Sequence, residues 1–226
     1  MPEPHGTIIN RVARGALAPL GLRRKGQSRF WHDDYGWRAF FVEFQPSSWS
    51  KGTYCNVGGS WLWDSTAGPG VWPFHVSERV GTPGGQFVRF DRDPSGFEGV
   101  VQQMAADAAR EIVRLRGLFR DLAAVAAYYE DQPAIGWPGY HGAVALGLTR
   151  RRKEAAARFM AVATESAGSD IEWVRGLSAS AASLAELVSD PDAFARAIED
   201  QVALNRAGHR MRAIEHPFSF NGAISA

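Results

Sequence analysis

The sequence predicts an α+β protein: an N-terminal helix, an antiparallel meander sheet and a long packing helix, followed by an all-α C-terminal region. The first observation is that six of the eight tryptophans lie in the first 72 residues, whereas the second half is rich in alanine. Aromatic residues favour strands and alanine favours helices. The second observation is a stripe of apolar residues at spacings of three and four from Phe97 to Ala126, which predicts one helix of about eight turns.

The N-terminal elements follow from apolar spacing and turn chemistry. Ile9, Val12, Ala16 and Leu20 recur every three or four residues and predict an amphipathic helix that begins at Thr7 and ends near Gly21. The two aromatic runs 30–32 and 37–45 flank the sequence Asp-Asp-Tyr-Gly, which favours a turn. We therefore expect a hairpin whose second strand is central, because both of its faces are largely apolar.

Residues 53–63 form a third aromatic run, which predicts a further strand with a bulge at its Gly-Gly pair. The segment Asp64 to Gly85 is rich in glycine and proline and is long for a connection in a compact domain. We interpret it as a functional loop. Residues 87–90 then predict an edge strand.

Ser95 and Glu98 have the spacing of a capping box and predict the start of the long helix. The segment 132–139 holds two prolines and two glycines and predicts a linker. The expected organisation is an α+β domain over 1–131, this linker, and a region of four helices over 140–226 that ends in a flexible tail.

Composition narrows the class of protein. The chain of 226 residues is 45% hydrophobic and carries a formal net charge of +1, which excludes a disordered chain and a strong overall attraction to nucleic acid or anionic membranes. One cysteine, Cys55, cannot form an intramolecular disulfide, which favours a reducing cytoplasm. The first 21 residues show neither a signal peptide nor a membrane span.

Three segments together resemble a known family. They are Leu20–Gly26 before an aromatic strand, a strand ending in Phe44-Gln45-Pro46-Ser47, and the strand Tyr54–Gly58. This part of the chain resembles an uncharacterised bacterial family catalogued only as a domain of unknown function. The resemblance covers Thr7 to Asp64 and departs at Leu22, where the family commonly has phenylalanine. It implies a free-standing bacterial α+β protein and no particular activity, cofactor or catalytic residue.

Asp33, Asp34 and Glu43 carry the enzymatic hypothesis. A carboxylate pair in a hairpin and an acidic residue on the next strand could together hold a divalent cation against phosphate, as in a metal-dependent nucleic-acid enzyme. Gln45 stands where such enzymes commonly have lysine. The favoured alternative is that the aspartates only accept local backbone hydrogen bonds in the turn. Histidine and cysteine spacing predicts no metal site, and the chain has no phosphate-binding or dinucleotide fingerprint, so no cofactor is predicted.

A basic segment carries the hypothesis of non-catalytic nucleic-acid binding. Arg23, Arg24 and Lys25 lie close in sequence to Phe30 and to two tryptophans, and together these residue types form surfaces that bind phosphates and stack bases. The alternative is that the cations are solvated and that the tryptophans belong to the core.

Gln45 and Asn56 are amides within otherwise apolar strands, where each must find hydrogen-bond partners. They either satisfy edges and loops of the sheet or point into a shared polar pocket, which Glu43 and His75 would complete.

The leading hypothesis is a non-catalytic, cytoplasmic protein-binding module of the adaptor or immunity type, with an unidentified protein partner, no membrane association and an open oligomeric state. Aromatic side chains dominate the energy of many interfaces. The expected binding residues are Trp63, Trp72, Phe74, His75, Gln45 and Asn56, with Arg23, Arg24 and Lys25 as the basic group.

Overall fold

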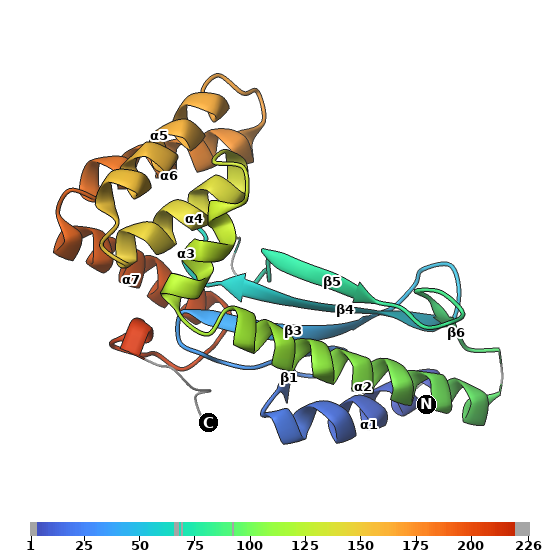
Figure 1. Ribbon diagram of the computed structural model, residues 1–226. Helices are drawn as coiled ribbons and strands as arrows, with labels where there is room; N and C mark the ends of the chain where they lie inside the picture. Colours follow the sequence, from blue (N-terminus) through green and yellow to red (C-terminus); the bar gives the residue numbers. More distant parts are fainter. Residues whose placement is uncertain (1–3, 66–67, 69, 92, 220–226) are drawn as a thin grey trace. The chain divides into compact units, whose positions relative to one another are not determined.

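The computed structural model describes residues 4–65, 68, 70–91 and 93–219, and it is an α+β protein (Figure 1). Its described residues form two compact units. Unit 1 lies within Met1–Ser60 and Phe74–Gly117, and unit 2 lies within Trp61–Pro73 and Leu118–Asn221. The predicted linker 132–139 therefore falls inside unit 2, and the tail from residue 220 onward lies outside the described residues.

Unit 1 is built on a sheet whose strands run in the order β1, β2, β3, β4 and β5, with β6 paired to β4. The β1–β2, β2–β3, β4–β5 and β4–β6 ladders are antiparallel. The predicted hairpin and the predicted meander are both present. The strands are β1 (Arg23–Arg24), β2 (Phe30–His32), β3 (Arg38–Gln45), β4 (Gly52–Trp61), β5 (Val76–Val80) and β6 (Val88–Arg89).

Strand β5 corrects the prediction that residues 64–85 form one long loop. Val76 and Val80 are buried, and the three residues between them are exposed. Glu78 pairs with Val57 in the β4–β5 ladder and lies 3.8 Å from Arg114 of the following helix. A charged residue thus occupies the place between the two valines where a strand pattern requires an apolar one. Because Glu78 interrupts the apolar alternation and glycines and prolines flank the segment, the sequence pattern does not indicate this strand.

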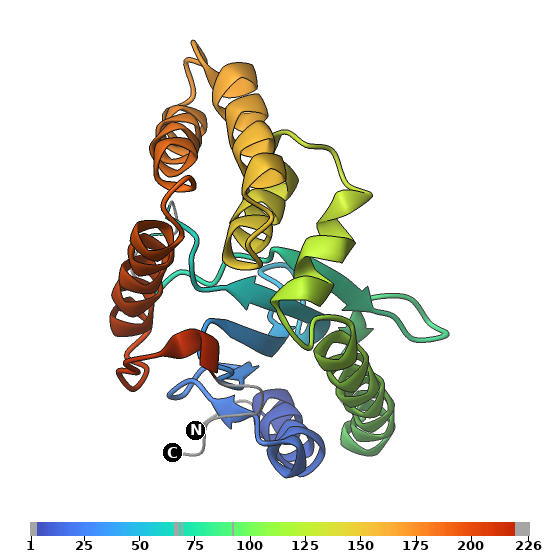
Figure 2. The same cartoon turned by 60° about the vertical axis from the view of Figure 1, so that its left-hand side comes forward.

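The two faces of the sheet differ in the elements that pack on them. Helices α1 (Pro4–Leu17) and α2 (Pro94–Leu118) both lie on one side of the sheet, as Figure 2 shows. Phe40, Val42 and Val57 occupy that face and are fully buried. Residues that pair across antiparallel strands share a face, so Phe41, Asn56 and Arg79 belong to the opposite face.

The N-terminal helix is confirmed, but it begins at Pro4 rather than Thr7. After Leu17 the chain forms one short 3-10 turn, Ala18–Leu20, that contains Pro19. Gly21 then takes a φ of 81° and donates its N–H to the carbonyl of Ala18. A left-handed conformation of this kind favours glycine, which explains why the 3-10 turn that extends the helix ends there.

The predicted helix of eight turns is two helices, α2 and α3 (Leu122–Glu130). Asp121 accepts a hydrogen bond from the backbone N–H of Ala124 at 2.8 Å and thereby caps α3. The apolar stripe continues across the break because Phe119 is buried there. The start of α2 also differs, since Asp93 accepts from the N–H of Ser95, whereas Glu98 pairs with Arg11.

Unit 2 is helical, and its four helices after α3 agree with the prediction. Asp190 caps the last of them with Pro191 at the first helical position, as the sequence indicates. No helix among the described residues is both long enough and apolar enough to cross a bilayer. These helices are α4 (Gly136–Leu148), α5 (Arg152–Ser166), α6 (Glu172–Leu187) and α7 (Pro191–Gly208), followed by a 3-10 turn at Pro217–Ser219.

Gly58 allows β5 to approach β4 closely. A Cβ atom at this position would lie 2.6 Å from the carbonyl oxygen of Val76 and 2.8 Å from Cζ of Phe41. We expect Gly58→Ala to lower the free energy of unfolding by about 1 to 3 kcal/mol, because the crowded atoms include backbone. Urea denaturation monitored by tryptophan fluorescence measures this loss.

Gly99→Ala in α2 is the matched control. A Cβ atom there has no neighbour within 4 Å, so the substitution should raise stability by up to about 1 kcal/mol. Equal effects of the two variants would contradict the close approach at Gly58.

Candidate functional site

The candidate site lies on the sheet face of unit 1 that the helices α1 and α2 do not cover. Four polar side chains from three neighbouring strands meet there: Glu43 and Gln45 of β3, Asn56 of β4 and Arg79 of β5. We call these four residues the sheet-face cluster. Their meeting follows from the ladder, in which Asn56 pairs directly with Arg79.

Asn56 is the centre of the sheet-face cluster. Its Nδ2 donates to Glu43 Oε2 at 3.1 Å and to Gln45 Oε1 at 2.9 Å, and its Oδ1 accepts from Arg79 Nε at 2.9 Å. Arg79 also donates to Gln45 Oε1 at 3.3 Å. The Asn56 side chain is buried, so these bonds remove the desolvation cost of its amide. The network therefore holds all four side chains in one arrangement.

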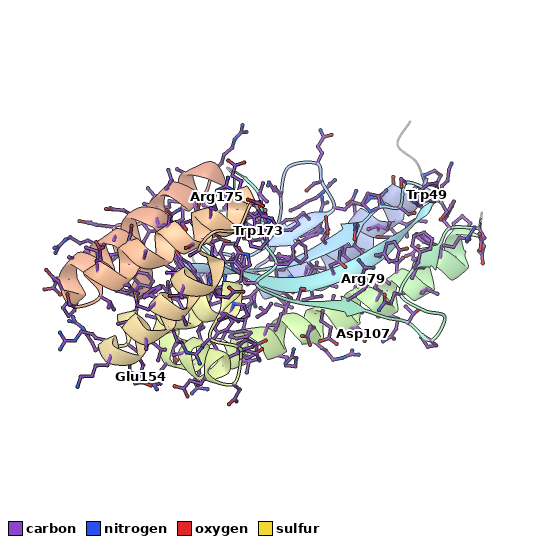
Figure 3. The ribbon with its side chains drawn as sticks, turned by 90° about the horizontal axis from the view of Figure 1, so that it is seen from above. Trp49, Arg79, Asp107, Glu154, Trp173 and Arg175 are labelled. Carbon is purple, nitrogen blue, oxygen red and sulfur yellow. The ribbon has the colours of Figure 1, made fainter. Side chains whose placement is uncertain are left out.

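Aromatic rings border the cluster on the Arg79 side. The Arg79 guanidinium lies 4.5 Å from the centre of the Tyr54 ring, and Tyr54 contacts Phe87 at 4.8 Å between ring centres. A cation above an aromatic ring is attracted by the negative face of the ring. Figure 3 shows Arg79 on β5, over the sheet. The guanidinium of Arg79 is thus held by hydrogen bonds and by the Tyr54 ring, although the residue is exposed.

Phe74 provides an exposed apolar group beside the cluster. Its ring is 42% exposed and packs edge-on against Phe41 at 4.6 Å, and Phe41 in turn stacks on Phe30 at 5.1 Å. A pocket of about 230 Å³ lies between Phe74 and the cluster, lined by Asn56, Phe74, Ser77, Glu78 and Arg79. The open sheet face therefore combines a rigid polar group, a half-exposed ring and a small depression.

Hydrogen bonds join Gln45, Asn56 and Glu43, three of the four residues of the hypothesis of a shared polar pocket. His75, the fourth member of that hypothesis, is half-buried and donates its backbone N–H to Gly59 at 3.1 Å. Sequence reasoning missed Arg79 because it lies inside the segment interpreted as a loop. The only signal available was the pair of valines at 76 and 80, which places Arg79 on the face opposite to theirs once a strand is assumed.

The expected aromatic anchors Trp63 and Trp72 do not present a surface to a partner in this structure. Trp63 is fully buried in unit 2 and donates its indole N–H to Nδ1 of His141 at 3.1 Å. Trp72 is 8% exposed and stacks on His209 with 4.0 Å between ring centres. Both tryptophans are thus core residues of unit 2, and of the three expected anchors only Phe74 is exposed.

The three carboxylates of the enzymatic hypothesis have separate structural roles. Asp34 accepts the N–H of Gly36 at 3.0 Å, which is the turn role favoured by the sequence. Asp33 is buried and accepts from the N–H of Phe40 at 2.6 Å and from Arg116 at 2.7 Å. Glu43 belongs to the sheet-face cluster. Within the described part of the chain these three carboxylates do not form a group with ligand atoms close enough to share a cation.

The basic segment is divided between several environments. Arg23 is exposed, and Lys25 donates its backbone N–H to Phe30 in the turn between β1 and β2. Arg24 donates to the backbone carbonyls of Gln27 and Ser28 in the same turn. Trp31 and Trp37, the rings expected to stack bases near these cations, are 3% and 1% exposed. Neither tryptophan is therefore exposed near the basic segment, where the nucleic-acid hypothesis requires a ring that stacks on bases.

Cys55 is fully buried on the helix face of the sheet, and burial raises the pKa of its thiol. Because the thiolate is the reactive form, a raised pKa makes this cysteine a poor nucleophile.

Comparison with known proteins adds no family to this geometry. The chain matches no family model, no curated protein and no solved structure. The resemblance of residues 7–64 to an uncharacterised bacterial family stays a prediction, and the site has to be interpreted from its own chemistry.

The burial of Trp72 changes the expected effect of removing it. We expect Trp72→Ala to lower the free energy of unfolding by about 3 kcal/mol or more, because the substitution empties a buried site that stacks on His209. Thermal unfolding followed by circular dichroism measures the loss. Trp49→Ala is the matched control, since Trp49 is 95% exposed and should leave stability within about 0.5 kcal/mol of the wild type. An unchanged melting temperature for Trp72→Ala would contradict a core role for Trp72 and support its role as a surface anchor.

Asp33 gives unit 1 a dependence of stability on pH. Burial raises the pKa of its carboxyl to about 6, and the neighbouring Arg116 guanidinium opposes that rise. In the unfolded chain the same carboxyl ionises near pH 4. The native state therefore holds the proton more tightly, and the stability contributed by this group is present below about pH 4 and is lost as the pH rises through 6.

The comparison of wild type with Asp33→Asn tests this, because only the wild type titrates at residue 33. Urea denaturation between pH 4 and 7 should give a difference in unfolding free energy, wild type minus variant, that falls as pH rises. A difference that grows with pH would show that the ion pair with Arg116 outweighs burial.

Proposed function

We propose that unit 1 is a non-catalytic protein-binding module and that the sheet-face cluster, with Phe74, is its contact surface. The observation that carries this proposal is the fixed network of Glu43, Gln45, Asn56 and Arg79 beside a half-exposed ring. Interfaces depend on a few rigid aromatic and arginine side chains whose rotamers are set before binding. Phe74 and Arg79 have this character.

The size of the pocket supports a protein as the partner. A volume of about 230 Å³ lies below the range of roughly 300 to 1,000 Å³ that encloses small-molecule ligands. It suits one side chain of a partner, inserted between Phe74 and Arg79. The surrounding face is a sheet surface, over which further contacts can spread.

The bonding of the cluster supports binding rather than catalysis. The hydrogen bonds of the Asn56 amide connect it to Glu43, Gln45 and Arg79, which are the other members of the cluster. Groups held in this way present a constant pattern of charge and shape. We place the module in a reducing cytoplasm, a proposal supported by its single, buried thiol at Cys55.

Site-specific photo-crosslinking tests the surface. Ser77 lines the pocket and is exposed, so a photo-reactive amino acid such as benzoylphenylalanine placed there should capture the partner as one discrete adduct on irradiation of the source cells. Phe74→Ala in the same chain should reduce the adduct by about tenfold, because it removes the central anchor. Its melting temperature should stay within a few degrees of the wild type, since the ring is 42% exposed.

The same photo-reactive residue at Trp49 provides the control. Trp49 is exposed in the connection between β3 and β4 and lies at one end of the sheet in Figure 3, apart from Arg79. Adducts of the same species and yield from positions 49 and 77, or no discrete adduct from position 77, would contradict the proposed surface.

A further inference from the structure

We propose that unit 1 also binds a ligand with two or more phosphate groups, in a groove between α1 and the turn that joins β1 to β2. This site is independent of the sheet-face cluster. The groove has a volume of about 860 Å³, and we call it the arginine groove. Its polar lining consists mainly of Asn10, Arg11 and Arg14 from the helix, Arg24 from the end of β1, and Gln27 and Arg29 from the turn.

The helix presents one face to the groove. Gly6, Asn10 and Arg14 recur every four residues, and Arg11 follows Asn10, so these residues share one side of α1. The buried side of the same helix is formed by Ile9, Ala13 and Leu17. The packing of α1 on unit 1 therefore fixes the direction in which its arginines point.

Two of the four guanidinium groups lack an acidic partner. Arg11 forms a bidentate pair with Glu98, with distances of 2.7 and 2.6 Å. Arg14 and Arg24 form no ion pair with any carboxylate of the described residues, and the contacts of Arg24 are with backbone carbonyls of its own turn. Those contacts orient the Arg24 side chain without neutralising its charge.

Arg29 enters the groove at a place where a glycine makes room for it. A Cβ atom at Gly6 would lie 3.1 Å from Nη2 of Arg29, and the same Nη2 lies 3.3 Å from Nε2 of His5. The guanidinium is therefore held against the first turn of α1. It lies in the same cavity as Arg14 and Arg24.

The charge of the unit agrees with an anionic ligand. The ranges 1–60 and 74–117 together hold 14 lysines and arginines and 10 aspartates and glutamates, a formal net charge of +4. A positive field of this kind raises the local concentration of anions and speeds their association.

The residue types in the lining select phosphate among anions. Guanidinium groups match the geometry of phosphate oxygens and bind them with two parallel hydrogen bonds. Several guanidinium groups in one cavity favour a ligand with several phosphates over one with a single carboxylate. No aromatic side chain is among the described residues that line the groove, so base stacking is not part of the recognition. Asn10, Thr7 and Gln27 supply neutral polar groups for hydroxyls of the ligand.

Isothermal titration calorimetry with inorganic tripolyphosphate tests the groove. The wild type should bind the probe, and Arg14→Gln should weaken binding by about tenfold or more, because a charged hydrogen bond is lost. Arg14 is exposed on α1 and makes no contact that the fold needs, so the variant should keep its melting temperature. Arg24→Gln should weaken binding as well, and circular dichroism checks that its turn is still folded.

Arg110→Gln is the matched control. Arg110 is an exposed arginine of α2 that is not among the residues lining the groove, and it pairs with Asp107 of its own helix. The variant loses the same charge from unit 1, yet binding should change by less than about twofold, since Arg110 makes no contact in the groove and its exposed charge acts only through screened, long-range attraction. Equal losses for Arg14→Gln and Arg110→Gln, or no binding of tripolyphosphate by the wild type at millimolar concentration, would overturn the proposal.

Two further probes identify where the phosphates come from. A nucleoside triphosphate and a single-stranded dT oligonucleotide are each titrated against wild type and Arg14→Gln. The groove is assigned to a nucleic-acid backbone if the oligonucleotide binds more tightly and if the slope of the logarithm of its binding constant against the logarithm of salt concentration is smaller in magnitude by about one in the variant. Tighter binding of the nucleoside triphosphate assigns it to a free phosphorylated metabolite. Both assignments require that Arg14 contacts the phosphates of the probe. If Arg14→Gln changes the affinity for neither probe, the proposed contact is contradicted.

Discussion

The apolar character of β3 on both faces is the constraint from which the rest of unit 1 follows. Phe40, Phe41, Val42 and Phe44 are all fully buried, so water must be excluded from each side of the strand. The helices α1 and α2 cover one side. On the other side Phe41 is shielded by the rings of Phe30 and Phe74, which lie on its own sheet face. This aromatic cover ends where β3 continues with Glu43 and Gln45, and there hydrogen bonds to Asn56 take over.

Local signals account for the parts of the fold that the sequence predicts. The hairpin around the Asp-Asp-Tyr-Gly turn, the end of the first helical segment at Gly21 and the cap of α7 at Asp190 each depend on neighbouring residues. The errors arise where the apolar periodicity does not report the structure. Strand β5 contains Glu78, whose side chain lies near Arg114, and the break after α2 keeps its apolar stripe because Phe119 is buried outside a helix. Periodicity within a window cannot report such partners.

The residues of the candidate site also divide into those that the sequence indicates and those that it does not. Gln45 and Asn56 are visible in the sequence because an amide in an apolar strand must be satisfied. The sequence does not indicate Arg79, because its pairing with Asn56 depends on the register of β5. That strand begins 20 residues after Asn56 and is not predicted from the sequence pattern. The tryptophans show the opposite error. Trp63 and Trp61 bury their rings in unit 2 and find partners for their indole N–H groups in His141 and Tyr129. Aromatic content alone therefore does not separate an anchor from a core residue.

The formal net charge of +1 hides the electrostatic organisation of the chain. The ranges of unit 1 carry +4, whereas those of unit 2 hold 11 basic and 14 acidic residues, a formal charge of −3. Within unit 1 the position of each carboxylate decides which arginines remain available. Asp33 accepts from Arg116 and Glu98 from Arg11, and both pairs connect α2 to the rest of the unit. The acids thus stabilise the packing of α2, and Arg14 and Arg24 keep their charge in the arginine groove. An anion site can in this way arise in a nearly neutral protein, because the fold uses its carboxylates elsewhere.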